Sequence, residues 1–168
     1  MKKIFFSLLV LTSSISAFSQ TKDVVDIAIS SPDHTTLVAA VKAADLVATL
    51  KGAGPFTVFA PTNAAFDKLP SGTVTNLLKP ENKAQLAKIL TYHVVAGNLD
   101  AAAVIAAIKA GKGKAVVTTV SGGKLTASLD KDKVMLTDES GKTAYVVAAD
   151  LKGSNGVVHV IDSVVLPK

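Results

Sequence analysis

The sequence contains no cysteine, no tryptophan and no arginine, and each absence excludes a class of protein. Without cysteine we expect neither a disulfide bond nor the lipid anchor of a bacterial lipoprotein. All 18 strongly basic side chains are lysines. Arginine is the residue that most often pairs with phosphates and with base edges. A nucleic-acid-binding role is therefore not expected.

Aromatic residues are also scarce, at 5% of the chain, so the core is expected to be aliphatic. The composition is 49% hydrophobic and 18% charged, which is typical of a globular domain. A chain of 168 residues is long enough for one domain with a buried core. The formal net charge of +5 falls to +3 without Lys2 and Lys3, which leaves 16 lysines against 13 acidic residues.

The N-terminus has the pattern of a signal peptide. Lys2 and Lys3 form a short basic region, and Ile4–Leu11 forms an apolar one. Ala17-Phe18-Ser19 places small residues at the −3 and −1 positions of a cleavage site before Gln20. The apolar run is too short to span a bilayer, and no second long run follows it.

The domain organisation predicted from this pattern is a leader over residues 1–19 and one domain over residues 22–168. We expect the protein to be exported, to the periplasm or beyond the cell. After cleavage we expect a monomeric domain without membrane insertion. No lipid anchor is expected, because no cysteine follows the leader.

One stretch, Gly54–Phe66, organises the rest of the chain. It predicts a strand with Phe56, Val58 and Ala60 on one face and with Thr57 and Phe59 on the other. A strand that is apolar on both faces is expected to be central and covered. Its last residue, Pro61, has no N–H to give to a neighbouring strand. The next two, Thr62 and Asn63, are expected to cap a helix that carries Phe66.

The remaining pattern predicts helices in the first two-thirds of the chain and strands in the last third, which is α+β. The hydrophobic spacing places helices at Thr21–Ser30, at His34–Lys51 with a kink and Asp33 as its cap, at Thr73–Lys79, from Pro80 to Leu90, and from Asp100 to Gly111. Extended segments are expected at Thr91–Val95, Lys114–Val120, Lys124–Leu129, Lys133–Thr137, Thr143–Leu151 and Val157–Leu166. Gly111-Lys112-Gly113-Lys114 is basic and glycine-rich, and it is interpreted as a helix stop rather than a phosphate loop.

Three stretches in order resemble the fasciclin domain: Gly54–Phe66, Leu90–Gly97 and Asn155–Pro167. The resemblance extends from Asp23 to Pro167. It implies a twisted β-wedge or sandwich with several short helices packed on one side, in which the first and third stretches are paired central strands. It also implies a secreted, non-enzymatic adhesion or interaction domain, similar to small single-domain bacterial members, that binds a surface or extracellular-matrix protein or a polysaccharide.

The resemblance implies two binding motifs. Tyr92-His93 matches the family's tyrosine–histidine motif, which is associated with integrin-type adhesion in animal members. Asp150-Leu151 aligns with its aspartate–isoleucine motif, with Leu in place of Ile. A structural interpretation stands beside the first: in an extended segment Tyr92 and His93 would face opposite ways and would hold the strand rather than form one contact surface.

Other motif residues are assigned to the fold. They are Thr57, Phe59, Pro61, Thr62, Asn63, Phe66, Asn155, Gly156, His159 and Asp162. Asn155-Gly156 is expected to form the turn into the last strand. His159, which stands between valines, is expected to be buried or half-buried with its ring hydrogen-bonded to backbone.

Catalysis, metal binding and cofactor binding find little support in the sequence. The three histidines, His34, His93 and His159, lack the local spacing of metal ligands, and His34 is expected at the surface. There is no Gly-x-Ser-x-Gly elbow and no phosphate-binding glycine fingerprint. We therefore predict no cofactor and no metal. Two alternatives stay open: a carrier of a small apolar ligand, which would need a large apolar cavity, and a cryptic hydrolase, which would need His93 or His159 beside a serine.

Overall fold

The computed structural model describes residues 21–168, so the predicted leader lies outside the described residues. The helices are α1 (Val24–Ile29), η1 (Pro32–His34), α2 (Thr35–Ala43), α3 (Val47–Leu50), α4 (Asn63–Asp67), α5 (Thr73–Leu77), η2 (Pro80–Asn82), α6 (Lys83–Tyr92) and α7 (Ala101–Ala110). The strands are β1 (Phe56–Pro61), β2 (Val94–Ala96), β3 (Lys114–Thr118), β4 (Lys124–Asp130), β5 (Lys133–Thr137), β6 (Thr143–Gly153) and β7 (Gly156–Ile161).

The strands form a seven-stranded sheet in the order β2-β1-β7-β6-β5-β4-β3. Only β1 and β7 are paired in parallel; the other neighbours are antiparallel. A bridge between Val95 and Thr119 joins the two ends of this order, so the sheet nearly closes on itself. The prediction that the first and third family stretches supply paired central strands is confirmed.

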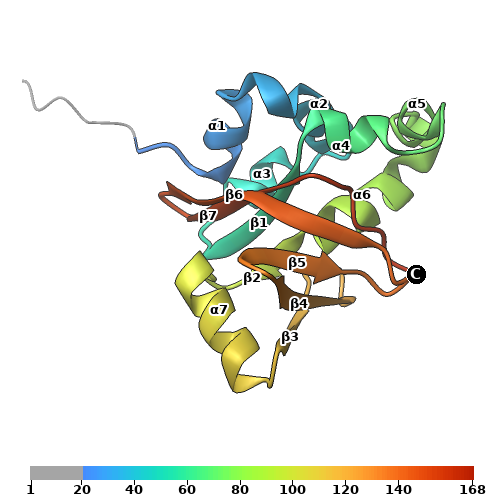
Figure 1. The fold of residues 1–168 in the computed structure, drawn as a ribbon. Coiled ribbons are helices and arrows are strands. Elements are labelled where there is room, and N and C mark those ends of the chain that lie inside the picture. The colour runs from blue at the N-terminus through green and yellow to red at the C-terminus, as the bar shows by residue number, and fades with distance from the viewer. Residues whose placement is uncertain (1–20) are drawn as a thin grey trace, which may run out of the picture.

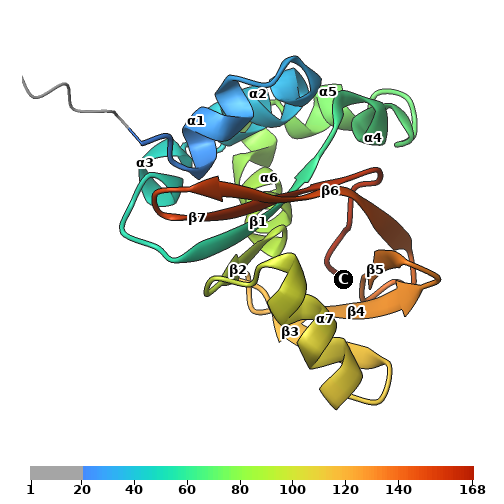
Figure 2. The same cartoon turned by 60° about the vertical axis from the view of Figure 1, so that its left-hand side comes forward.

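The helices lie in two places relative to this sheet (Figure 1). Helices α1 to α5 form a layer above β1, β6 and β7, and α6 descends behind the sheet toward β2 (Figures 1 and 2). Helix α7 lies apart from that layer and packs against β3 and β4. The predicted α+β class is confirmed. The expected layer of short helices on one side is formed by α1 to α5, and α7 lies on another side of the sheet (Figure 2).

The two faces of β1 enter two different cores, as the alternation predicts. Val58 and Ala60 belong to the core beneath the helical layer. Phe59 belongs to the core inside the curved sheet, which α7 closes. Thr57 points to the same side as Phe59 and is fully buried. Burial on both faces explains why this strand is apolar almost throughout.

Several boundaries differ from the sequence-based expectations. The segment Thr91–Val95 is not extended throughout: α6 continues to Tyr92, and only Val94 begins a strand. The last strand ends at Ile161 rather than Leu166. It ends early because Asp162 turns its backbone N–H to the Tyr145 carbonyl (3.1 Å) and accepts the Tyr145 N–H on Oδ1 (2.9 Å).

The start of the second helix was also predicted wrongly. Asp33 makes no side-chain cap; it lies within the 3-10 turn η1, and α2 begins at Thr35. His34 is buried rather than exposed. Its Nδ1 lies 2.8 Å from the Ser31 hydroxyl, whereas its Nε2 is buried without a hydrogen-bond partner. Burial lowers the pKa of His34.

Candidate functional site

Four chain segments converge at one end of the sheet and surround an open groove. They are the entry to β1, the exit from β2, the end of β6 and the start of β7, which meet because β7 runs parallel to β1 while β2 and β6 run antiparallel to them. The groove has a volume of about 490 Å³ and is lined by Ala53, Gly54, Pro55, Asn98, Asp100, Lys152, Gly153, Ser154, Asn155, Gly156 and Val157. We call it the end groove.

The linker between β2 and α7 forms one wall of the end groove and is held from the core side. The Thr57 hydroxyl donates to the Gly97 carbonyl (2.7 Å) and accepts the Leu99 N–H (2.9 Å). The His159 Nε2–H donates to the Leu99 carbonyl (2.7 Å). His159 is buried and stacks on Phe59, with ring centroids 5.7 Å apart. The prediction that His159 is buried and bonded to backbone is confirmed.

We expect Thr57→Val to lower the free energy of unfolding by about 2 kcal/mol, because it leaves the Leu99 N–H without its acceptor in a nearly dry site. The variant keeps the shape of the side chain, so the loss reports the hydroxyl. Thr57→Ser keeps the hydroxyl and should lose less. Urea denaturation of the three proteins measures the difference, and equal stability of Thr57→Val and wild type would contradict this role.

A bulge in β6 brings Asp150 to the same region. The pairing with β7 shifts register twice, between Val146 and Ala148 and again between Ala148 and Leu151, so the residues just before Leu151 bulge from the ladder. Asp150 has a left-handed backbone (φ 60°), and its Oδ1 accepts the first N–H of α7, from Ala101, at 2.7 Å. Its own N–H points to His159 Nδ1 (3.4 Å). Leu151 follows with 38% of its surface exposed, directly before the groove residue Lys152.

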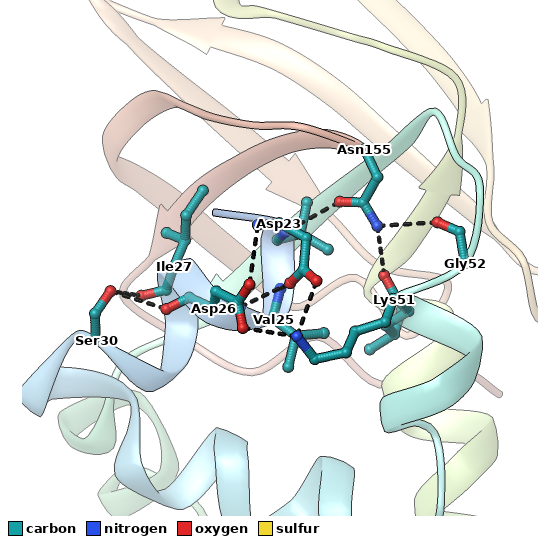
Figure 3. Close-up of polar contacts among 10 residues, drawn as sticks. Asp23, Val25, Asp26, Ile27, Ser30, Lys51, Gly52 and Asn155 are labelled. Atoms are coloured by element: carbon teal, nitrogen blue, oxygen red, sulfur yellow. Dashed lines mark hydrogen bonds and ion pairs between the residues drawn. The ribbon is translucent and has the colours of Figure 1, made fainter. Parts of the chain in front are cut away.

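The other wall of the end groove is fixed by Asn155, whose side chain bonds to two helices (Figure 3). Its Oδ1 accepts the Val24 N–H at the start of α1 (3.0 Å), and its amide donates to the carbonyls of Leu50 (2.8 Å) and Gly52 (3.0 Å). Gly156 is required beside it, because a Cβ there would lie 2.0 Å from the Phe56 carbonyl oxygen. The turn is Ser154-Asn155 rather than the predicted Asn155-Gly156, because Gly156 already pairs with Gly153 as the first residue of β7. Asn155 is also an anchor for the helical layer.

A charged cluster lies next to Asn155, at the start of α1. Lys51 Nζ bridges Asp23 (2.9 Å) and Asp26 (2.6 Å), and the two aspartates also form the capping box of α1 (Figure 3). The hydrogen bond from Lys51 lowers the pKa of Asp26, and the same bond raises the pKa of Lys51. Sequence reasoning missed this cluster; the Asp-x-x-Asp spacing before an apolar run was the available signal for the capping box.

Tyr92 and His93 lie in the interior rather than on the surface. Tyr92 is fully buried and ends α6, and its hydroxyl donates to the Lys124 carbonyl (2.7 Å). His93 Nδ1–H donates to the Ile89 carbonyl (2.8 Å), and its Nε2 accepts the Val165 N–H (3.3 Å). Complete burial lowers the pKa of His93 to about 4. A partner could reach neither side chain in this conformation.

The remaining motif residues hold neighbouring elements together. Thr62 caps α4 by accepting the Ala65 N–H (3.2 Å). Asn63 is not a cap of that helix: it accepts the Thr36 N–H (3.0 Å) and donates to the Pro32 carbonyl (3.0 Å), which ties α4 to the start of α2. Two more, Pro61 and Phe66, are buried, and Asp162 binds β6 as described above.

The described residues offer little for a ligand carrier, a hydrolase or a metal site. The apolar cavity beneath α1 and α2 has a volume of about 40 Å³, whereas pockets for small molecules are of the order of 300–1,000 Å³. Within residues 21–168, neither His93 nor His159 bonds to a serine, and His34, which does, has no acid on its other nitrogen. Nowhere in that range do three His, Asp or Glu side chains gather closely enough to hold a metal ion. Every helix in the described part of the chain is too short or too polar to cross a bilayer.

A nearly closed mixed sheet with helices on two sides defines the chain as an α+β domain, and comparison with known proteins gives its family. Residues 32–167 match the profile of the fasciclin domain. Over 154 residues the chain is 49% identical to Protein sll1483 of Synechocystis sp., which covers 92% of this chain and 78% of that protein. It is 38% identical over 123 residues to the cell surface glycolipoprotein MPB83 of Mycobacterium bovis, covering 73% of this chain and 48% of that protein.

A solved structure shows the same fold. It is a FAS1 domain pair from the insect cell adhesion molecule fasciclin I, with a TM-score of 0.54 and 24% identity, covering 76% of this chain and 40% of that chain. The chain belongs to the fasciclin domain family. This confirms the resemblance carried by the three sequence stretches.

Proposed function

We propose that this protein is an exported adhesion domain that binds a protein or polysaccharide at a cell surface or in the extracellular matrix. The family has cell-adhesion and interaction roles among its members, and relatives of this chain include a cell surface glycolipoprotein. Export is supported by the leader pattern of residues 1–19. The domain acts without a cofactor, by surface contact.

The observation that carries the proposed contact is the β6 bulge at the end groove. The bulge holds Asp150 against the start of α7, and the 38% exposed Leu151 directly precedes Lys152, which lines the end groove of about 490 Å³. An exposed apolar side chain with polar groups around it matches the apolar centre and polar rim of a protein contact. Tyr92 and His93 act from the interior, where they fix α6 and the C-terminal segment.

The proposed contact is tested with the immobilised protein and surface extracts of the producing organism. Leu151→Glu is expected to reduce captured material at least about fivefold, because a buried charge in a contact costs more than 1 kcal/mol. Val147→Glu is the matched control: Val147 is 55% exposed on the same strand, and unlike Leu151 it is not adjacent in the chain to a residue that lines the end groove. Equal capture by Leu151→Glu and wild type would contradict the proposed site.

A further inference from the structure

We propose that the turn between α7 and β3, together with the outer face of β3 and β4, binds an acidic polysaccharide. This surface is separate from the end groove: the groove lies at the start of α7, and the turn lies at its other end, at the tip of the molecule away from the helical layer (Figures 1 and 2). We call Lys109, Lys112 and Lys114 the basic turn. All three side chains are exposed.

Among the described residues, the three lysines of the basic turn make no ion pair, and the acidic residue on this face, Asp130 at the end of β4, accepts the Tyr145 hydroxyl and is paired with Lys133 in the strand register. Residues 101–129 contain four lysines and no acidic residue, so they carry more positive charge than the whole chain after leader removal. The ion pairs within residues 21–168 are made by other lysines and leave the basic turn without a carboxylate partner. The fourth lysine, Lys124, lies at the far end of the face, where its backbone N–H binds the Glu139 carboxylate.

The backbone of the basic turn is fixed by its own hydrogen bonds. The Gly113 N–H donates to the Ile108 carbonyl (2.8 Å), and the Gly111 N–H donates to the Ala107 carbonyl (2.9 Å). Lys112 takes the left-handed conformation (φ 55°). A Cβ on Gly111 would lie 1.9 Å from the Lys114 carbonyl oxygen, so only glycine permits this closure. The three lysines are therefore presented from a preorganised loop.

Some of the positive charge of the basic turn is explained by its position at the C-terminal end of α7, which cations stabilise. Lys109 lies in the last turn of α7, where a cation interacts favourably with the helix dipole. This effect falls off within one turn and does not reach Lys114, which belongs to β3 and pairs with Ser128 of β4. The helix terminus thus leaves Lys114 unexplained.

The neighbouring sheet face has the chemistry of a sugar contact. In the β3–β4 register Lys114 lies opposite Ser128, and Val116 opposite Thr126. Val116 is 61% exposed, the highest among the exposed large apolar side chains. Hydroxyls beside an exposed aliphatic group match a pyranose ring, which presents hydroxyls at its edge and C–H groups on its face, while the lysines match its carboxylates or sulfates.

Two other polyanions fit the surface less well. A membrane-binding loop buries apolar side chains in the interface, whereas Lys109-Ala110-Gly111-Lys112-Gly113-Lys114 contains no large apolar residue. A single-stranded nucleic acid stacks its bases on aromatic rings. Tyr145 of β6 lies on this sheet face two strands away from β4, and its hydroxyl donates to Asp130 (2.9 Å).

The test measures binding of the purified protein to alginate, a carboxylated polysaccharide, with neutral dextran as the comparison. Lys109→Gln/Lys112→Gln/Lys114→Gln is expected to weaken alginate binding about tenfold, since each exposed ion pair contributes a few-fold. Wild-type binding is expected to weaken between 50 and 300 mM salt, because exposed charges are screened. The arginine triple variant at the same positions keeps the charge and should keep the affinity.

The matched control is Lys22→Gln/Lys42→Gln/Lys79→Gln, which removes the same charge from exposed positions in α2, before α1 and before η2. It is expected to change alginate affinity less than about threefold. Equal loss in the two triple variants would overturn the site, as would binding to anionic vesicles or single-stranded DNA without binding to alginate. Leu151→Glu should leave alginate binding unchanged, so this inference and the proposed end-groove contact can fail separately.

Discussion

Replacing Asn155 by alanine is expected to lower the free energy of unfolding by roughly 2–4 kcal/mol, because one side chain satisfies three backbone groups of α1 and of the α3 end. All three groups are only partly accessible to water, so they would lose their partners without full replacement by solvent. For a domain of this size the change corresponds to a decrease in Tm of roughly 5–15 °C. Thermal denaturation followed by circular dichroism measures it.

Two further variants make the Asn155 prediction specific. Asn155→Asp keeps an oxygen acceptor for the Val24 N–H and loses both donors, so its Tm should lie between alanine and wild type. Lys51→Met removes the neighbouring ion pairs at the surface and should shift the Tm less than Asn155→Ala does, because exposed pairs contribute little. A Tm for Asn155→Ala within 2 °C of wild type would correspond to a loss of about 1 kcal/mol or less in the free energy of unfolding. That result would contradict the anchoring role.

The second large effect is a loss of stability in acid that is due to His93. Its pKa is lowered from the ordinary 6.5 to about 4 by burial, so between these values the unfolded chain binds a proton that the folded protein does not. Stability therefore is complete above about pH 6.5, falls as the pH is lowered through this window, and levels off below pH 4. The shift corresponds to roughly 3 kcal/mol.

Denaturant titrations at several pH values, with His93→Gln as the comparison, check this assignment. The variant should be less stable than wild type at pH 7 and should have a shallower pH dependence between 6.5 and 4. Some dependence should remain, because burial also lowers the pKa of His34. An NMR titration that gives His93 a pKa near 6.5 in the folded protein, or an unchanged slope in the variant, would contradict the prediction.

Much of the fold followed from local pattern. The alternation in Gly54–Phe66 predicted a strand with two buried faces, and β1 divides the two cores as expected. Caps at Thr62 and Asp100 were predictable because a helix start needs an acceptor within three residues. Strand alternation and helix caps depend on residues that are close together in the chain, so they can be predicted from the sequence alone.

The incorrect expectations concern contacts between distant residues. His34 has polar neighbours in sequence and was expected at the surface, but it is buried in η1, which packs against α1, α2 and α4. Tyr92 looked extended because two valines follow it at Val94 and Val95, yet it is the last residue of α6. Its ring packs against Gly123 so closely that a Cβ on that glycine would lie 2.5 Å from it. Asn155 bonds to residues more than 100 positions away, which no local pattern indicates.

The candidate site was predictable in outline only. The resemblance marked Asp150-Leu151, and this pair lies directly before the groove residue Lys152, at the end of a bulge that the sequence does not reveal. The glycines of Gly111–Lys114 were correctly interpreted as a helix stop, but that interpretation left the lysines without an assigned role. Their unpaired charge became visible only when the ion pairs of the described residues were known.

Capture of surface material by the immobilised protein, plotted against Tm for a common set of variants, tests the central claim of surface-mediated adhesion most directly. The set comprises Leu151→Glu, Val147→Glu, Thr57→Val and Asn155→Ala, measured at a temperature where every variant is folded. We expect Leu151→Glu to lose capture at an unchanged Tm, and Thr57→Val and Asn155→Ala to lose Tm with most of their capture retained. If capture instead falls only in the destabilised variants, the contact surface proposed around Leu151 is wrong.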